Sequence, residues 1–348
     1  MSLLDQPRLL EKFRSFHSYV RKNNGQMGTK QRGIDLNYNN ACNLKCEYCF
    51  TNSPKGDHVK DELPIDLVAD IADQADELGI FEFDLQGGEL LLKPDKLFEV
   101  LEAIKPERFY LYLTTNGYFL DEKMAKRLAD AMVRRVSVSI DSMDEKVHDE
   151  VRGRKGSWKR AMEALKHLKN VGIDPYLNIT VGHYNAFSKD IELLCQYSQD
   201  QGYTTLINVA TPGGMAQNHG EIMVDEKDSA HLIELRKKHK NILRNLWNPF
   251  DRKHEQVLGC NTVNRLYITP LGDVLVCPYV HIKIGNVYEQ SLKEIADYGF
   301  SIKHFRNHSD LCLAGEDKEF VSKYMCREGQ TIFNPSLAKD IFKEEDFV

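Results

Sequence analysis

Polar and apolar residues alternate in several short segments of the first two thirds of the chain, as in Val136-Ser137-Val138-Ser139-Ile140. A period of two residues is typical of a β-strand with one buried face. We predict six such strands, at residues 33–38, 81–86, 109–115, 135–141, 175–182 and 205–211.

Helical patterns lie between these segments. Apolar side chains recur at helical spacing in two sets, Val68, Ile71, Ala72, Ala75 and Leu78, then Leu97, Val100, Leu101 and Ile104. Strands that alternate with helices form βαβ units and a parallel sheet, so the sequence predicts an α/β fold. In α/β barrels the functional loops follow the carboxyl ends of the strands.

The pattern changes after residue 211. Residues 225–246 are expected to form one long helix, and residues 266–268 and 274–276 a β-hairpin around the turn Thr269-Pro270-Leu271-Gly272-Asp273. A short helix is predicted at 291–298. Residues 1–32 and 331–348 are expected to be packing extensions or frayed ends.

Composition narrows the function classes. The 348 residues suggest one large or two smaller domains, and the net charge of −6 argues against nucleic acid as a partner. No secretion signal and no apolar stretch of membrane-spanning length is visible in the sequence. Eight cysteines are too few for a secreted disulfide framework. We therefore expect a cytoplasmic protein, because a reducing compartment suits free thiolates.

Three cysteines lie close together at Cys42, Cys46 and Cys49, directly after the first predicted strand. Three thiolates in so short a loop can hold three irons of an iron–sulfur cube. A [4Fe–4S] cluster normally takes four cysteines, and no fourth lies nearby, so one iron is left for another ligand. Zinc is the alternative, although a structural zinc site usually requires a fourth Cys or a His at short spacing.

This CxxxCxx(aromatic)C spacing resembles that of the radical S-adenosylmethionine (radical SAM) superfamily, in which the open iron binds the amino and carboxylate groups of SAM. The resemblance implies a partial (β/α)6 barrel. It also implies that an electron from flavodoxin or ferredoxin cleaves SAM to methionine and a 5′-deoxyadenosyl radical, which removes a hydrogen atom from the substrate. The cofactor then carries the difficult chemistry and the protein orients it.

Further motifs at the strand ends resemble those of the same superfamily. Gln86-Gly87-Gly88-Glu89 is similar to its GGE motif, and Thr114-Thr115-Asn116-Gly117 to its TNG motif. A guanidinium matches a carboxylate with two hydrogen bonds, so Arg152 is expected on the SAM carboxylate, with a surface cation as the alternative. The resemblance implies SAM contacts from Tyr48, Gly87, Gly88, Glu89, Asn116, Ser139, Asp141, Arg152 and Asn178. For Asn178 and for Thr180, a strand face turned to a helix or to water is the alternative.

Four more cysteines follow, Cys260, Cys277, Cys312 and Cys326. Their arrangement around the predicted hairpin resembles the start of SPASM and twitch domains, which carry additional iron–sulfur clusters. Full SPASM domains have more cysteines, so the twitch type with one auxiliary [4Fe–4S] cluster is implied. The spacing is similar to that in 2-deoxy-scyllo-inosamine dehydrogenases. A tetrathiolate zinc site is the alternative, although the gaps are long and irregular for one.

The resemblance divides the chain into five parts. These are an N-terminal extension (1–32), a radical SAM partial barrel (33–224), a linking helix (225–254), a β-hairpin-plus-helix twitch domain (255–330) and a C-terminal tail (331–348).

Some roles stay open. If all four C-terminal thiolates bind one cluster, it has no open iron and is an electron acceptor; without Cys326, one iron is free to bind substrate. Cys195 lies with Ile191 and Leu194 on an apolar helix stripe and is expected to be a buried small residue rather than a hydrogen-atom donor. No catalytic residue is assigned; Gln86 and His183 are the candidates, and Tyr184 and Asn185 are expected near the substrate.

The sequence thus predicts a radical SAM oxidoreductase that oxidises a sugar, an aminocyclitol or a nucleotide-linked carbohydrate, with the auxiliary cluster as electron acceptor. The first alternative is a maturase that cross-links or epimerises a ribosomal peptide. The second is a non-catalytic zinc or iron–sulfur binding protein.

Overall fold

The computed structural model describes residues 6–56, 58–251, 256–325 and 327–348. Their strands form one sheet of eleven strands in the order β11-β10-β9-β8-β1-β2-β3-β4-β5-β6-β7. The six predicted strands are confirmed as β1 (Gly33–Asn37), β2 (Glu82–Gln86), β3 (Tyr110–Thr115), β4 (Arg135–Ser139), β5 (Asp174–Val181) and β6 (Thr204–Val209). In the described residues the two ends of the sheet do not pair with each other, so the barrel is partial.

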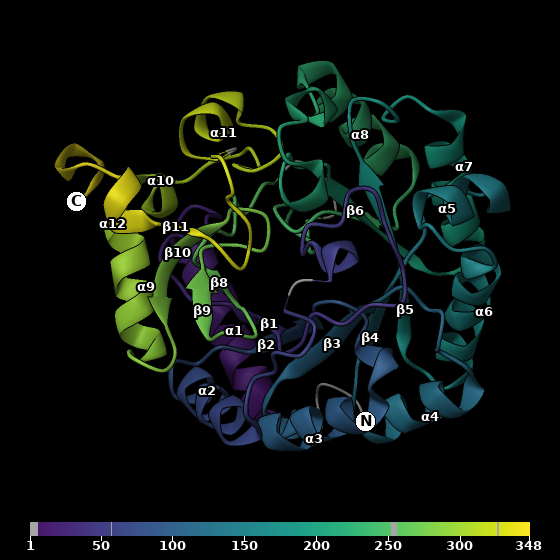
Figure 1. Cartoon of the computed structure of the whole chain (residues 1–348), viewed down its shortest axis with the longest axis horizontal. Coiled ribbons are helices and arrows are strands. Elements are labelled where there is room, and N and C mark those ends of the chain that lie inside the picture. Colours follow the sequence, from purple (N-terminus) through teal and green to yellow (C-terminus); the bar gives the residue numbers. More distant parts are fainter. Residues whose placement is uncertain (1–5, 57, 252–255, 326) are drawn as a thin grey trace.

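Strands β1 to β6 are parallel, each paired with the next. Helices follow the strands and cover the outer face of the sheet (Figure 1). They are α2 (Ile65–Glu77), α3 (Pro94–Ile104), α4 (Glu122–Asp130), α5 (Glu145–Val151), α6 (Ser157–Asn170) and α7 (Lys189–Gln201).

The alternation in the strands explains which face turns outward. Ile34, Leu36, Phe83 and Leu85 are fully buried in the main hydrophobic core, together with the apolar faces of α2 and α3. The residues between them, such as Asp35, line the inside of the barrel. Charged and polar side chains of the strands therefore point into the barrel, and the apolar core lies between sheet and helices.

The C-terminal third continues the same sheet instead of forming its own. Strand β8 (Arg265–Ile268) pairs in parallel with β1 and antiparallel with β9 (Asp273–Leu275), which makes the predicted hairpin. Strands β10 (Ile282–Asn286) and β11 (Ser336–Leu337) follow. The helices of this region are α9 (Leu292–Ser301), α10 (Lys303–Arg306), α11 (Lys318–Tyr324) and α12 (Ala338–Ile341).

The long helix predicted at 225–246 is wrong in its extent. Helix α8 spans Glu226–Lys238, and β7 (Ile242–Leu243) then pairs in parallel with β6. His239 leaves the helical backbone at φ −116° and ψ 104°, and Ile242 is buried in the core. The local pattern alone favours two more helical turns after Lys238. The chain leaves the helix there instead, because Ile242 is buried at the edge of the sheet.

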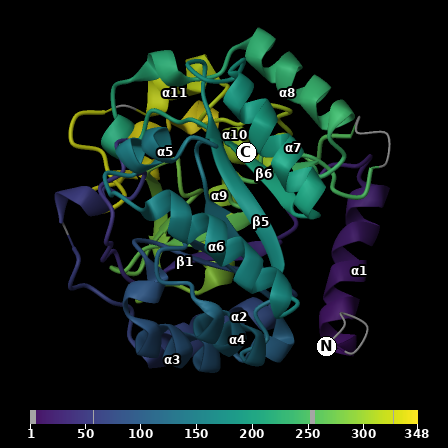
Figure 2. The same cartoon turned by 90° about the vertical axis from the view of Figure 1, so that its right-hand side faces the viewer.

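The N-terminal segment is a packing extension. Helix α1 (Pro7–Lys22) stands beside the barrel (Figure 2) and buries Leu9, Phe16 and Val20 with Phe81, which directly precedes β2. It thus covers the amino-terminal ends of the strands, opposite the cysteine loop. Short 3₁₀ turns complete the described chain at Ser53–Lys55, Leu90–Leu92, Pro106–Arg108, Gly214–Ala216, Gly220–Ile222 and Glu344–Asp346.

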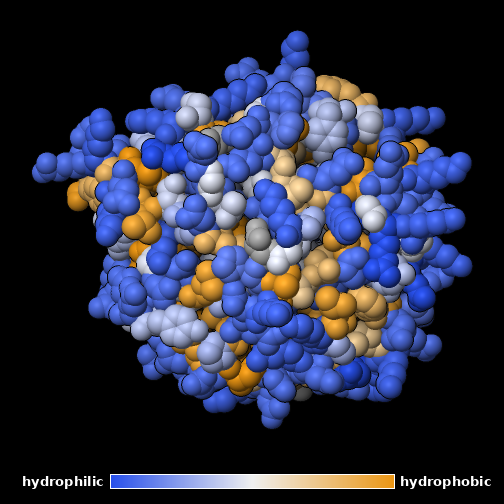
Figure 3. Space-filling view, viewed as in Figure 1, coloured by the Kyte–Doolittle hydropathy of each residue, from blue (hydrophilic) through white to orange (hydrophobic). Residues whose placement is uncertain are grey.

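The surface is mostly hydrophilic. Figure 3 shows polar side chains over most of one face, with smaller apolar patches between them. Among the described helices, none combines the length and the apolar character that crossing a membrane requires.

Candidate active site

Both groups of cysteines line one cavity. The cavity has a volume of about 1050 Å³ and extends from the barrel interior to the carboxyl ends of the strands. Its lining includes six thiols, those of Cys42, Cys46, Cys49, Cys260, Cys277 and Cys312. Cys326 lies outside the described residues. The seven described cysteines, Cys195 included, are free thiols.

The first cysteine loop is held by backbone hydrogen bonds from three directions. Glu89 N–H donates to the Ala41 carbonyl (2.7 Å), just before the loop. Lys45 N–H donates to the Arg152 carbonyl (3.1 Å) at the end of α5, and Met215 N–H donates to the Cys49 carbonyl (2.9 Å). The loop is therefore fixed by segments that follow β2, β4 and β6.

Gly88 is required by the close approach of two chain segments. A Cβ atom at this position would lie 2.1 Å from the carbonyl oxygen of Ala41, far inside contact distance. The glycine therefore allows the end of β2 to lie directly against the residue that precedes Cys42.

Glu89 is a structural link rather than a wall of the cavity. Its side chain is buried, and its carboxylate accepts hydrogen bonds from Thr115 Oγ1 (2.6 Å) and Asn116 N–H (2.8 Å). The Asn116 side chain in turn donates to Asn43 Oδ1 (2.8 Å) in the cysteine loop. Glu89 is absent from the lining, so it orders the TNG segment, which does line the cavity.

Arg152 and Asp141 form an ion pair beside the first cysteines. Arg152 Nε donates to Asp141 Oδ2 (2.6 Å) and Nη2 to Oδ1 (3.0 Å), while Nη1 lies 3.7 Å from Cys46 Sγ. The Tyr48 hydroxyl donates to the same carboxylate. Burial alone raises the pKa of a carboxyl, but the guanidinium holds the pKa of Asp141 below its ordinary value. The two-pronged contact expected for the SAM carboxylate is thus made to Asp141.

The structure brings together most of the residues for which the sequence implied SAM contacts. Those on the cavity wall are Tyr48, Gly87, Gly88, Asn116, Ser139, Asp141, Arg152 and Asn178, with Gln86, Thr180, Tyr184 and Asn185 beside them. On β5 and β6, Asn208 Nδ2 donates to Asn178 Oδ1 (2.7 Å). Both of these strands therefore present neutral polar groups to the cavity.

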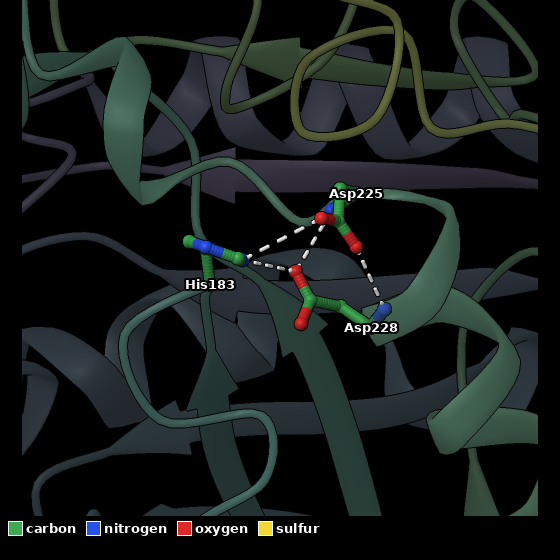
Figure 4. Close-up of side chains that lie close together, drawn as sticks. All are labelled: His183, Asp225 and Asp228. Atoms are coloured by element: carbon green, nitrogen blue, oxygen red, sulfur yellow. Dashed lines mark hydrogen bonds and ion pairs between the residues drawn. The ribbon is translucent and has the colours of Figure 1, made fainter.

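His183 does not line this cavity. Its imidazole Nδ1 lies 2.8 Å from Asp228 Oδ2, and its side chain is 57% exposed. Asp225 and Asp228 cap the first turn of α8 through reciprocal hydrogen bonds, as Figure 4 shows. His183 therefore connects the segment after β5 to the start of α8 through Asp228 Oδ2, while Asp228 Oδ1 is buried without a hydrogen-bond partner among the described residues.

The second set of thiols comes from three separate segments. Cys260 precedes β8, Cys277 follows β9, and Cys312 lies between α10 and α11. Burial, together with the neighbouring thiol of Cys260, raises the pKa of Cys312 to about 12. Thiols in this environment stay protonated unless a bound cation compensates their charge.

Backbone N–H groups point at these sulfurs, which fits metal-bound thiolates. Tyr279 N–H donates to Cys277 Sγ (3.3 Å), and in the first set Leu44 N–H donates to Cys42 Sγ (3.5 Å). Such donors stabilise negative charge on sulfur, as in iron–sulfur sites. The donor sets therefore fit two iron–sulfur clusters.

An aromatic contact connects the two sets. The rings of Phe50 and Tyr279 lie 5.3 Å apart between centroids, at an interplanar angle of 67°. Phe50 directly follows Cys49, and Tyr279 follows Cys277 by two residues. The two cysteine sites therefore face each other across a short, packed segment of the same cavity wall.

Cys195 is fully buried on α7 with Ile191 and Leu194, and it does not line the cavity. Its surroundings are those of a small apolar residue.

Sequence reasoning missed a row of charged groups deep in the cavity. Asp35, Asp84, Arg135 and Arg265 all line it. The signal was present in the strands, because each of these residues occupies an inward position of the alternating pattern.

The comparisons with known proteins agree with this arrangement. A family model described as the Radical SAM superfamily matches residues 36–197, and one described as an iron–sulfur cluster-binding domain matches residues 260–320. The chain is 25% identical to the AdoMet-dependent heme synthase of Methanosarcina barkeri, over 78% of this chain and 83% of that one. It is 28% identical to the mycofactocin maturase MftC of Mycolicibacterium smegmatis, over 81% and 73%.

The fold is similar to that of solved structures. Streptococcus suis SuiB, solved bound to the precursor peptide SuiA, has a TM-score of 0.60 at 17% identity, over 83% of this chain and 69% of that one. At this identity the likeness concerns the fold alone.

Proposed function

Because this chain is a radical SAM enzyme with a C-terminal iron–sulfur cluster-binding domain, we propose that it oxidises a hydroxyl-bearing small molecule, a sugar or an aminocyclitol. In the proposal Cys42, Cys46 and Cys49 hold the [4Fe–4S] cluster that binds SAM. Cys260, Cys277 and Cys312 hold an auxiliary cluster. When reduced, the first cluster cleaves SAM and supplies the radical that removes a hydrogen atom.

The observation that carries the proposal is the shared cavity. Six thiols from both domains line it, and neutral polar groups from β5 and β6 lie on its wall. A substrate bound there is within reach of both cysteine sites, so it can lose a hydrogen atom on one side and an electron on the other. The oxidation of an alcohol to a ketone balances when the substrate loses one hydrogen atom, one proton and one electron.

The residues of this chain bind and orient the reactants in the proposal. The paired Asp141 and Arg152 order the wall beside Cys46. Asn178, Thr180 and Asn208 offer donors and acceptors that suit hydroxyl groups. We expect the electron for SAM cleavage to come from a flavodoxin or a ferredoxin.

The test is anaerobic reconstitution with iron and sulfide, followed by dithionite and SAM. We expect 5′-deoxyadenosine to form, and its yield to rise when a suitable carbohydrate or aminocyclitol is added. The product should be lighter than its substrate by two hydrogen atoms, as measured by mass spectrometry. Failure to release 5′-deoxyadenosine would overturn the proposal.

A second candidate is a peptide maturase, favoured by the match to mycofactocin maturase over most of both chains. It predicts that 5′-deoxyadenosine yield responds to a precursor peptide and not to carbohydrates. The same assay, run with both classes of compound, separates the two candidates.

A further inference from the structure

Most of the inner charged groups of the barrel are joined by hydrogen bonds, and two are not. Glu82 accepts two hydrogen bonds from Arg32, at 2.8 and 3.1 Å. Arg265 is bonded to Asp35 through Nε (3.1 Å) and also to Glu82 (2.9 Å). Three carboxylates and three guanidinium groups lie at this level of the barrel, and these contacts satisfy all but one of each.

Asp84 is the unsatisfied carboxylate. Its Oδ1 is buried and has no hydrogen-bond partner among the described residues, and Oδ2 lies 3.7 Å from Arg265 Nη2, which is already bonded to Asp35. Burial, with the nearby carboxylate of Asp35, raises the pKa of Asp84 well above its usual range, although Arg265 and Arg135 oppose this shift. The carboxyl thus lacks the partners that a buried acid requires.

Arg135 is the unsatisfied guanidinium. It is stacked between two rings, with its central carbon 3.7 Å from the centroid of Tyr112 and 4.5 Å from that of Tyr176. Its Nε is buried without a hydrogen-bond partner, and no carboxylate of the described chain forms an ion pair with it. The stacking fixes the plane of the Arg135 guanidinium and leaves the N–H groups at its edge free to donate to a hydrogen-bond acceptor of a ligand.

Asp84 and Arg135 lie on either side of Tyr112 in the sheet. Asp84 pairs with Tyr112 on β3, and Tyr112 pairs with Arg135 on β4. Neighbouring strands lie about 4.8 Å apart, so the two backbones are about 10 Å apart, with the buried Tyr112 ring between them. A ring compound that reaches both groups would therefore lie over Tyr112, on the cavity side. Both residues point inward, and both line the cavity.

We propose that Asp84 and Arg135 form the specificity-determining floor of the substrate cavity and bind hydroxyl or amino groups of a neutral or amino-substituted polyhydroxylated ring. This inference rests on the proposed function, because it assigns the substrate of the same cavity. A hydroxyl group both donates and accepts, so it satisfies the carboxylate and the guanidinium together. An anionic group in the same place would lie against the carboxyl group of Asp84, to which it could donate no hydrogen bond.

The floor lies at a useful depth. Ser139 ends the strand that Arg135 begins, so the floor is about 13 Å below the level of Ser139, at 3.3 Å per residue. A ring held at the floor extends toward the cysteine sites with its opposite edge. The floor therefore determines which ring carbon faces the mouth of the barrel.

The test uses four variants of the reconstituted full chain. Asp84→Asn and Arg135→Gln each remove one partner. The matched controls are Asp130→Asn and Arg14→Gln, which change exposed residues outside the cavity lining. Binding of myo-inositol, 2-deoxy-scyllo-inosamine and inorganic phosphate is measured by calorimetry. The release of 5′-deoxyadenosine without any added ring compound is measured on the same samples.

We expect at least one of the two ring compounds to bind the parent protein, with about tenfold or greater weakening in Asp84→Asn and Arg135→Gln and less than twofold in the controls. Release of 5′-deoxyadenosine without an added ring compound should stay unchanged in the two control variants. No binding of either ring compound, equal binding by floor and control variants, or tighter binding of phosphate would overturn the inference while leaving the radical chemistry intact. Absence of 5′-deoxyadenosine from the parent protein would instead overturn the proposed function.

Discussion

The two cysteine sites of this protein are built in opposite ways. Cys42, Cys46 and Cys49 lie within one loop after β1, and segments from three other strands hold that loop in place. Cys260, Cys277 and Cys312 come from distant segments. The β8–β9 hairpin and the hydrogen bond from Cys260 N–H to the Ser309 carbonyl (2.8 Å) bring these segments together. The first site is formed by residues close in sequence, and contacts from other strands stabilise it. The second site is formed by residues far apart in sequence that the tertiary structure brings together.

This difference predicts separable failures. Loss of a ligand in the local site should remove SAM cleavage, because the cluster that holds SAM is lost. Loss of a ligand in the non-local site should spare SAM cleavage and stop the later electron transfer.

Cys46→Ala is expected to have the largest effect. The variant loses one of three thiolates of the first site, so 5′-deoxyadenosine should fall below detection and iron content by about half. Cys195→Ala is the matched control, because that thiol is equally free but buried on α7 away from the cavity. Retention of SAM cleavage in Cys46→Ala would show that the first site has been misassigned.

Cys277→Ala should distinguish the role of the second cysteine site from that of the first. We expect 5′-deoxyadenosine to form without substrate at the parental rate, whereas the oxidised product falls by about a hundredfold or more because the electron has no acceptor. Iron content should again fall by about half, measured by a colorimetric iron assay. Normal product formation in this variant would remove the auxiliary cluster from the reaction.

Gly88→Ala tests the support of the local site without touching a ligand. The added methyl group would lie 2.1 Å from the Ala41 carbonyl, so the segment before Cys42 must move. Such overpacking typically costs about 1 to 3 kcal/mol, and we expect SAM cleavage to fall about tenfold or more. The control is Gly220→Ala, where an added Cβ meets nothing within 4 Å. Equal activity of the two variants would argue against a rigid loop.

Arg152→Lys should weaken the ion pair with Asp141 beside the first cysteine site, and with it the binding of SAM. A lysine carries the charge but cannot make both hydrogen bonds that Arg152 makes to Asp141. We expect the dissociation constant for SAM to rise about tenfold by equilibrium binding, with auxiliary-site iron unchanged. Unchanged SAM affinity would show that the pair is structural only.

The same contrast explains how much the sequence could reveal. The local cysteine loop and the alternation of the six strands depend on residues a few positions apart, and both were predictable. The pairing of Asp141 with Arg152, and the inner row with Asp84 and Arg135, depend on strand register and on which faces turn inward together. The end of α8 was mispredicted because burial of Ile242 at the sheet edge is a tertiary effect.

A change remote from both sites should alter stability and leave the iron sites intact. His17 on α1 packs against Phe13 and Phe250, and its burial, with Arg32 nearby, lowers its pKa to about 4 from 6.5. Because the folded-state pKa is depressed, this histidine's contribution to stability is fully present above pH 6.5 and is lost as the pH falls toward 4. With its partial exposure, we expect a loss of about 1 kcal/mol in the free energy of unfolding between pH 7 and pH 5.

His17→Gln should make that part of the pH dependence disappear in denaturant titrations. The His167→Gln variant is the control, because His167 lies on α6 outside the cavity lining. Iron content of both variants should equal that of the parent protein at pH 7, since α1 covers the end of the barrel opposite the cysteine loop. Loss of iron in His17→Gln would mean that the amino-terminal end of the barrel is coupled to the cysteine sites. Both sites would then depend on the packing of α1 against the barrel.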